Sequence, residues 1–103
     1  MKVHKETIKY EDEKELSWLW FYDIGLKREI SLPLDRWNWN GDTEKPTINP
    51  SVLTDDGMGN ISHLFIRDGK LIYLSDCTHE LKGKTVDMLD WEVETNFIDI
   101  GDW

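Results

Sequence analysis

A hairpin signal between Ser62 and Ser75 constrains the fold of this 103-residue chain more than any other stretch. Asp68-Gly69 separates two apolar runs, and this dipeptide readily adopts the positive φ angles of a two-residue type I′ turn. A two-residue turn fixes the register of both strands. The predicted pairs are Ile66 with Leu71, Phe65 with Ile72, Leu64 with Tyr73, His63 with Leu74 and Ser62 with Ser75.

This register predicts which side chains share a face of the hairpin, because successive side chains of a strand point to opposite faces. Phe65, Ile72, His63 and Leu74 fall on one face. The other face is also largely apolar, and strands that are apolar on both faces are typical of sheets covered on both sides. The sequence therefore predicts a central hairpin with a covering layer on each face.

The rest of the chain predicts more strands and no long amphipathic helix. A first edge strand is predicted over Lys2–Tyr10, and Leu16–Tyr22 is an unbroken aromatic strand with Leu19 and Phe21 on one face and Trp18, Trp20 and Tyr22 on the other. Arg28–Leu34 is a strand that Pro33 ends or confines to an edge. A last strand is predicted over Glu92–Ile100, whereas Arg36–Leu53 and Glu80–Met88 are expected to be mainly irregular.

These elements predict a mostly β protein with little helix, folded as one domain over residues 1–103. The expected architecture is a small antiparallel sandwich or a partly open barrel around the central hairpin. The single cysteine excludes an internal disulfide, and neither a signal peptide nor a membrane-spanning apolar run is visible. These features predict a soluble protein of a reducing compartment.

Negative charge is concentrated toward the C-terminal end of the sequence. Acidic residues outnumber basic ones by 21 to 12, and Asp87–Trp103 contains no Lys or Arg. Phosphate binding needs Lys and Arg, so direct binding of nucleic acid is not expected, whereas a partner protein with a basic surface could bind here. The predicted contacts are Asp87, Asp90, Glu92, Glu94, Asp99 and Asp102. The alternative is a solvated strand and tail.

Two small clusters have a possible chemical role. Trp37 and Trp39 could form an aromatic platform for a base or peptide, although packing against the core is the alternative. The hairpin register places Cys77 and His79 on the face of Ser62, where they could form a metal or nucleophilic site. His63 is a further metal candidate. The alternatives are a buried thiol, a capping imidazole and a structural histidine.

Several motifs together resemble a known family between Trp37 and Asp87. They are Trp37-Asn38-Trp39-Asn40-Gly41-Asp42, Lys45-Pro46-Thr47-Ile48-Asn49-Pro50-Ser51, Ser62-His63 with Phe65-Ile66-Arg67-Asp68-Gly69, and Ser75-Asp76-Cys77-Thr78-His79-Glu80-Leu81 with Gly83-Lys84-Thr85-Val86. The series resembles a family of small phage and prophage proteins of unknown function, some of which carry an ammonia-monooxygenase label. Typical members look like zinc ribbons.

The resemblance implies a zinc site that this chain has largely lost. Family members carry a Cys-x-x-Cys near the N-terminus and a Cys before the histidine that matches His63. This chain has no Cys in its first 35 residues and has Ser62 at the second position. Structural zinc needs four ligands, so a chain that keeps only Cys77 and His79 of that set is expected to fold without zinc or another cofactor.

Phage resemblance, small size and acidity together predict a protein that is not an enzyme and that binds and inhibits a host protein with a basic surface. The expected location is then the cytoplasm of a bacterial host cell. A bacterial defence nuclease complex, blocked by an anti-CRISPR or another anti-defence inhibitor, is one such target. Two alternatives remain from the sequence. One is a protein that binds or sequesters a nucleotide, and the other is a degenerate zinc-binding structural domain.

Overall fold

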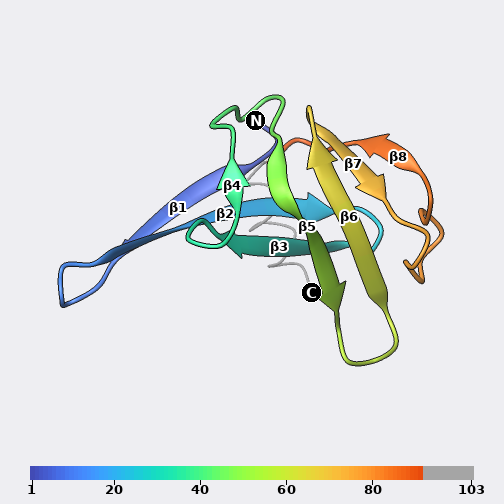
Figure 1. Cartoon of the computed structure of the whole chain (residues 1–103), viewed down its shortest axis with the longest axis horizontal. Coiled ribbons are helices and arrows are strands. Elements are labelled where there is room, and N and C mark those ends of the chain that lie inside the picture. The colour runs from blue at the N-terminus through green and yellow to red at the C-terminus, as the bar shows by residue number, and fades with distance from the viewer. Residues whose placement is uncertain (92–103) are drawn as a thin grey trace, which may run out of the picture.

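The computed structural model describes residues 1–91, which form eight strands and no helix (Figure 1). The strands are β1 (His4–Lys9), β2 (Glu15–Asp23), β3 (Arg28–Pro33), β4 (Asn38–Trp39), β5 (Ile48–Asp55), β6 (Ile61–Arg67), β7 (Lys70–Tyr73) and β8 (Thr85–Asp87). Within this part of the chain, no helix is long and apolar enough to cross a membrane.

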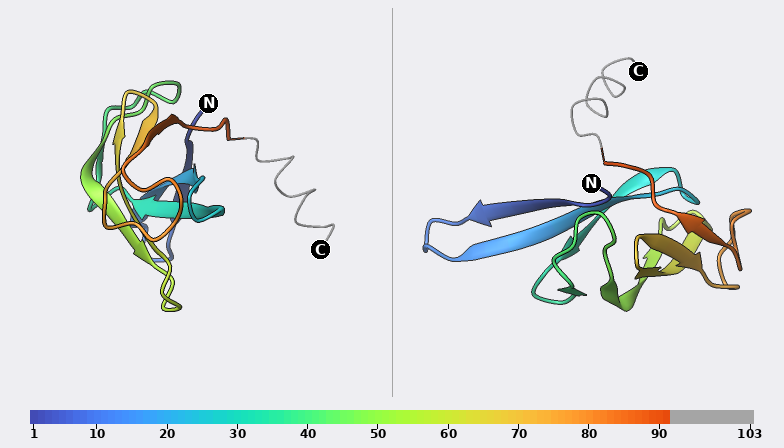
Figure 2. Two further views of the ribbon diagram at one scale, coloured as in Figure 1. Left: turned by 90° about the vertical axis from the view of Figure 1, so that its right-hand side faces the viewer. Right: turned by 90° about the horizontal axis from the view of Figure 1, so that it is seen from above.

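The strands form two antiparallel sheets that pack as layers. One sheet has the order β1-β2-β3, and the other has the order β4-β5-β6-β7-β8. Figure 2 shows that the sheets lie one above the other and that neither closes into a barrel. The predicted mostly β sandwich is therefore confirmed.

The core lies between the two sheets, and β2 shows how the sequence specifies it. Leu19 and Phe21 on one face are fully buried, whereas Trp18, Trp20 and Tyr22 on the opposite face are only half-buried. The predicted division into two faces is confirmed. Apolar burial of this kind is the main driving force for folding. The other buried side chains of this core are Val3, Leu32, Ile48, Val52, Leu64, Ile66, Leu71, Tyr73, Cys77 and Met88.

The predicted hairpin register is confirmed in β6 and β7. Leu64 lies opposite Tyr73, and Ile66 lies opposite Leu71. Asp68 and Gly69 have φ angles of 49° and 75°, the positive values that a type I′ turn requires.

The prediction that the hairpin is covered on both faces is wrong. In β6, Ser62, Leu64 and Ile66 are buried, whereas His63 and Phe65 on the outer face are only half-buried. The two-layer sandwich covers one face of each sheet, and residues 1–91 contribute no third layer over the outer face of the five-stranded sheet. The outer face of β6 is therefore accessible, and it carries a histidine.

Two segments that were expected to be mainly irregular contain strands. β5 forms despite Pro50 because the β5–β6 register shifts between Ile48 and Val52, which accommodates the proline in a bulge. β8 forms because Val86 pairs with Leu71 at the edge of the hairpin. The predicted end of β3 at Pro33 is confirmed, whereas the strand predicted over Glu92–Ile100 lies outside the described residues.

Candidate functional site

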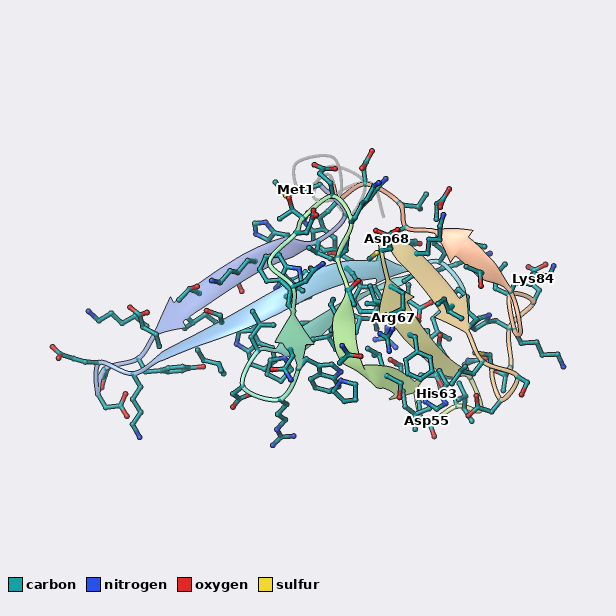
Figure 3. All side chains as sticks on the ribbon, turned by 45° about the horizontal axis from the view of Figure 1, so that its top comes forward. Met1, Asp55, His63, Arg67, Asp68 and Lys84 are labelled. Carbon is teal, nitrogen blue, oxygen red and sulfur yellow. The ribbon has the colours of Figure 1, made fainter. Side chains whose placement is uncertain are left out.

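A serine, a histidine and an aspartate converge on the outer face of the five-stranded sheet. β5 carries Ser51, β6 carries His63, and the loop after β7 carries Asp76. His63 Nε2 lies 3.1 Å from Ser51 Oγ, and His63 Nδ1 lies 2.8 Å from Asp76 Oδ2. Figure 3 shows His63 close to Asp55, the last residue of β5, at the end of the sheet away from the Asp68 turn.

Strand register brings Ser51 to His63. Leu53 lies opposite His63 in the β5–β6 ladder, and Ser51 is two residues earlier on β5. Diagonal neighbours of this kind lie on the same face within reach of long side chains. The bulge between Ile48 and Val52 sets the position of Ser51 in this arrangement.

Backbone hydrogen bonds hold the loop that carries Asp76 beside β6. The Leu74 N–H donates to the His63 carbonyl (2.8 Å), and the Thr78 N–H donates to the Ile61 carbonyl (3.0 Å). The loop is therefore fixed on both sides of Asp76, and its carboxylate is placed against the imidazole of His63.

The partners of the His63 ring determine which nitrogen carries its proton. An ionised Asp76 carboxylate can only accept a hydrogen bond, so the neutral ring carries its proton on Nδ1. Nε2 is then free to accept the hydroxyl proton of Ser51. The His63 and Asp76 side chains are 24% and 57% exposed, so a substrate can reach them. This is the geometry of a nucleophile, a general base and an orienting carboxylate.

A second serine–histidine pair lies on the opposite face of β6, with the ring in the other tautomer. His79 Nε2 is 3.1 Å from Ser62 Oγ, while His79 Nδ1 accepts a hydrogen bond from the Leu81 N–H (3.2 Å). Because Nδ1 is an acceptor, the neutral ring carries its proton on Nε2 and donates it to Ser62. His79 therefore cannot act as a base toward Ser62, which is also fully buried.

A buried polar network packs around this second pair. The Tyr73 hydroxyl donates to Asp23 Oδ1 (2.7 Å), and the Tyr73 ring meets His79 edge-on with ring centroids 4.7 Å apart. Burial, and then the hydrogen bond to Asp23, raise the pKa of Tyr73, so its hydroxyl stays protonated. At Gly25, an added Cβ would lie only 2.2 Å from His79 Cε1. The network thus ties the three-stranded sheet to the loop that carries Asp76.

The residues proposed for metal binding lie in separate environments. The Cys77 thiol accepts from the His63 N–H (3.2 Å) and donates to the His63 carbonyl (3.3 Å). His79 contacts Ser62, as the register predicted, while His63 faces the other side of the sheet. Among residues 1–91, no three His, Cys, Asp or Glu side chains are grouped so that they could hold a metal ion.

Trp37 and Trp39 both pack against the core. The Trp39 Nε1–H donates to the Asp42 carbonyl (3.1 Å), and Trp37 Nε1 is buried. Core packing was the alternative to an aromatic platform, and a ligand at these residues stays a prediction.

Of the six acidic residues predicted to contact a partner, the two that the structure describes are paired with lysines of this chain. Asp87 is bound to Lys70, and Asp90 lies 3.0 Å from the Lys2 ammonium. Each lysine lowers the pKa of its aspartate below the ordinary value. The other four predicted contacts, Glu92, Glu94, Asp99 and Asp102, lie outside the described residues.

Sequence reasoning missed Ser51 and Asp76 as site residues. The available signal was a serine, a histidine and an aspartate in three consecutive segments of a β protein. Their convergence depends on the bulge in β5 and on the loop after β7, neither of which a local pattern reveals.

Comparison with known proteins gives one match. No curated protein and no solved structure matches the chain significantly. A family model described as bacterial ubiquitination-like system serine protease (BubE) matches residues 1–74, which include Ser51 and His63 but not Asp76. The prediction that the protein is not an enzyme is wrong, because the matching family is named as a serine protease. Since the match covers more than half of the sequence, the chain belongs to the BubE family.

Proposed function

We propose that this protein is a serine hydrolase that cleaves an amide bond, with Ser51 as nucleophile, His63 as general base and acid, and Asp76 as the orienting carboxylate. One observation carries the proposal: Ser51, His63 and Asp76 are joined by contacts of 3.1 Å and 2.8 Å through the correct ring nitrogens. The family description, which names a serine protease, supports the same chemistry.

The first half of the reaction forms an acyl-enzyme. Ser51 Oγ attacks the carbonyl carbon of the substrate, and His63 Nε2 takes the hydroxyl proton. Asp76 stabilises the imidazolium that forms and keeps the ring oriented. When the tetrahedral intermediate collapses, His63 returns the proton to the leaving nitrogen, the C–N bond breaks, and the acyl group stays on Ser51.

The second half hydrolyses the acyl-enzyme. His63 Nε2 takes a proton from water, the hydroxide attacks the ester carbonyl, and Ser51 leaves with the proton from His63. Negative charge on the carbonyl oxygen needs backbone donors. Ser51 lies within the register shift of β5, outside the regular β5–β6 ladder, and we assign its own N–H as one such donor.

The biological setting is part of the proposal. The family description places its members in a bacterial ubiquitination-like system. We propose that this chain acts in such a system, in the bacterial cytoplasm, on an amide bond in a protein or protein conjugate. Inhibition of a host protein stays an untested prediction, and no contact among residues 1–91 favours it over hydrolysis.

Active-site labelling tests the proposed chemistry without a known substrate. A fluorophosphonate probe phosphonylates a serine that an adjacent base activates: the serine oxygen bonds to phosphorus and fluoride leaves. We expect the probe on Ser51, located by peptide mass spectrometry. Ser51→Ala should abolish labelling. Ser62→Ala is the matched control and should keep it. Absence of labelling in the folded wild-type protein would contradict the proposal.

A further inference from the structure

A groove of about 440 Å³ begins next to Ser51 and lies between the two sheets. β5 forms one wall through Val52–Asp55, β3 forms the other through Arg28–Leu32, and Trp37 also lines the groove. Figure 1 shows the lower half of β5 passing in front of β3, with the β3–β4 connection beside it. The nucleophile of the triad therefore stands at one end of this groove on the same strand.

Most of the β5 edge that borders the groove has no partner strand in residues 1–91. β4 pairs with β5 only at Asn49 and Ile48. From Val52 to Asp55, β5 pairs with β6 alone. The open edge thus begins directly after Ser51, and β4 occupies the edge before it.

The alternation of hydrogen bonds shows which backbone groups face this open edge. The carbonyls of His63 and Ile61 accept hydrogen bonds from residues that follow β7, so the backbone N–H and C=O groups of these two residues point away from β5. Neighbouring residues of a strand point to opposite sides. Ser62 and Leu64 therefore face β5, where they oppose Thr54 and Val52.

The remaining residues of β5 must then point the other way. Leu53 and Asp55 oppose His63 and Ile61, so their N–H and C=O groups face the groove. A row of alternate backbone donors and acceptors at an exposed sheet edge is a template for an added strand.

We propose that an extended peptide segment of the substrate adds as a strand to β5 over Val52–Asp55 and so presents its scissile bond to Ser51. This inference rests on the proposed hydrolase function and names the substrate class of that site. Because β4 covers the edge before Ser51, the added strand extends on one side of the scissile bond only. The protein recognises an extended peptide from one side of the bond that it cleaves.

The walls of the groove indicate which side chains the segment carries. Leu32 and Val52 are apolar and nearly fully buried, and Trp37 lies beside them. Arg28, Glu29 and Asp55 give the rim both signs of charge. A strand presents alternate side chains to one face, so apolar residues at every second position fit the groove, and no net charge of the peptide is required.

An N-methyl scan tests the strand pairing from the substrate side. Wild-type protein is incubated with peptides from a casein digest, and mass spectrometry identifies the best-cleaved peptide. Each of its backbone amides is then methylated in turn. We expect methylation of alternate amides on one side of the scissile bond to lower kcat/KM about tenfold each, because each removes one backbone hydrogen bond. A flat profile, or cleavage of no peptide by protein that the fluorophosphonate labels, would overturn the assignment.

Proline substitution tests the same pairing from the protein side. Leu53→Pro removes a groove-facing N–H without removing a ladder bond to β6, and we expect a loss of at least tenfold in kcat/KM for the peptide, mainly through KM. Leu53→Ala loses the same side chain but keeps the N–H, so the difference in kcat/KM between Leu53→Pro and Leu53→Ala measures the lost backbone hydrogen bond. Lys5→Pro is the matched control, since Lys5 lies on the outer edge of β1 in the other sheet.

Labelling separates this inference from the proposed chemistry. Leu53→Pro should still react with the small fluorophosphonate at Ser51, because that probe does not need the groove. Unchanged peptide cleavage by Leu53→Pro would rule out strand pairing of the peptide with β5 and would leave the proposed triad untouched. Lack of labelling in the wild-type protein would rule out the proposed catalytic role of the triad itself. Thermal melting identifies a variant that does not fold, and the N-methyl scan then decides the question without it.

Discussion

Two serine–histidine pairs, one on each face of β6, have the same Nε2–Oγ distance, but only one of the two histidines can accept a proton from its serine. Ser51 and His63 lie 3.1 Å apart on the outer face, and Ser62 and His79 lie 3.1 Å apart on the inner face. The distance between serine and histidine therefore does not distinguish the two pairs. They differ in the group that contacts the other nitrogen of each ring.

That second contact decides whether the histidine can be a base. Asp76 accepts from Nδ1 of His63 and leaves a lone pair on Nε2 for the hydroxyl of Ser51. The Leu81 N–H donates to Nδ1 of His79, which leaves the proton on Nε2. The partner of Nδ1 therefore separates a general base from a structural hydrogen-bond donor.

Replacing each histidine should give the largest difference between the pairs. His63→Ala removes the proposed general base, and we expect kcat to fall by about 10⁴-fold or more. His79→Ala removes no catalytic group and should keep activity within about tenfold. It should lower the free energy of unfolding by about 1–3 kcal/mol, because the buried Ser62 hydroxyl loses its partner. Peptide hydrolysis and chemical denaturation measure the two effects.

The control is to measure the free energy of unfolding of His63→Ala and the activity of His79→Ala. His63 is 24% exposed at the sheet surface, so the free energy of unfolding of His63→Ala should lie within about 1 kcal/mol of the wild-type value. If His79→Ala lost as much activity as His63→Ala while remaining folded, the distinction between the two pairs would be wrong.

Asp76→Asn should give the His63 ring the tautomer that His79 has, with the proton on Nε2. An asparagine amide can donate to Nδ1, which moves the neutral ring proton to Nε2, as in His79. We expect kcat to fall by about 10²–10⁴-fold, with the lower end reflecting the exposure of Asp76. Nitrogen NMR of the His63 ring measures the tautomer directly. Asp76→Glu restores an acceptor and should recover part of the activity, whereas equal loss in both variants would contradict the tautomer argument.

The sequence predicted the inner pair more readily than the outer one. The Asp68-Gly69 turn fixed the β6–β7 register, and strict alternation then placed Ser62 and His79 on the same face. The same alternation separated His63 from them correctly. Local turn chemistry and the period of two were sufficient for β6 and β7. Since β7 ends at Tyr73, His79 reaches Ser62 from a loop and not by continued alternation along a strand.

The outer pair depends on features that a local pattern does not contain. Pro50 marked β5 as irregular, because a proline in a strand removes a donor, and only the bulge reconciles the two. Asp76 reaches His63 because the loop after β7 is held to β6 by backbone hydrogen bonds between distant residues. From the sequence, His63 was a metal candidate or a structural histidine on an apolar strand face, because nothing local placed a serine and an aspartate beside it.

Gly25 connects the inner pair to the rest of the fold. A Cβ at this position would lie 2.2–2.6 Å from three atoms of the His79 ring. We expect Gly25→Ala to lower the free energy of unfolding by about 1–3 kcal/mol and to reduce activity less than Asp76→Asn does. The displaced ring belongs to the loop that carries Asp76, which gives the route from this position to the outer pair.

A double variant isolates the cause of the Gly25 effect. Gly25→Ala combined with His79→Ala removes the clash, so the two changes together should cost less stability than the sum of the single changes. Additive losses, measured by urea denaturation of all three variants, would show that the methyl group disturbs the backbone rather than His79.

Tyr73 gives the smallest expected effect, a dependence of stability on alkaline pH. Its pKa is raised in the folded protein, first by burial and then by the hydrogen bond to Asp23. Above the ordinary tyrosine pKa of about 10, the unfolded chain loses this proton while the folded chain keeps it. The folded state then binds more protons, so stability falls as pH rises, by up to about 1.4 kcal/mol per pH unit.

Tyr73→Phe removes this dependence and so separates it from that of other alkaline groups. At neutral pH the wild type should be the more stable, by about 0.5–1.5 kcal/mol, because Asp23 keeps its hydroxyl donor. Above pH 10 that advantage should shrink, whereas hydrolysis by His63 and Ser51 on the opposite face should change little between the two proteins at any pH. A stability difference that stays constant from neutral pH to pH 11 would show that Tyr73 titrates alike in the folded and unfolded chains, and burial beside Asp23 would then not favour the protonated hydroxyl.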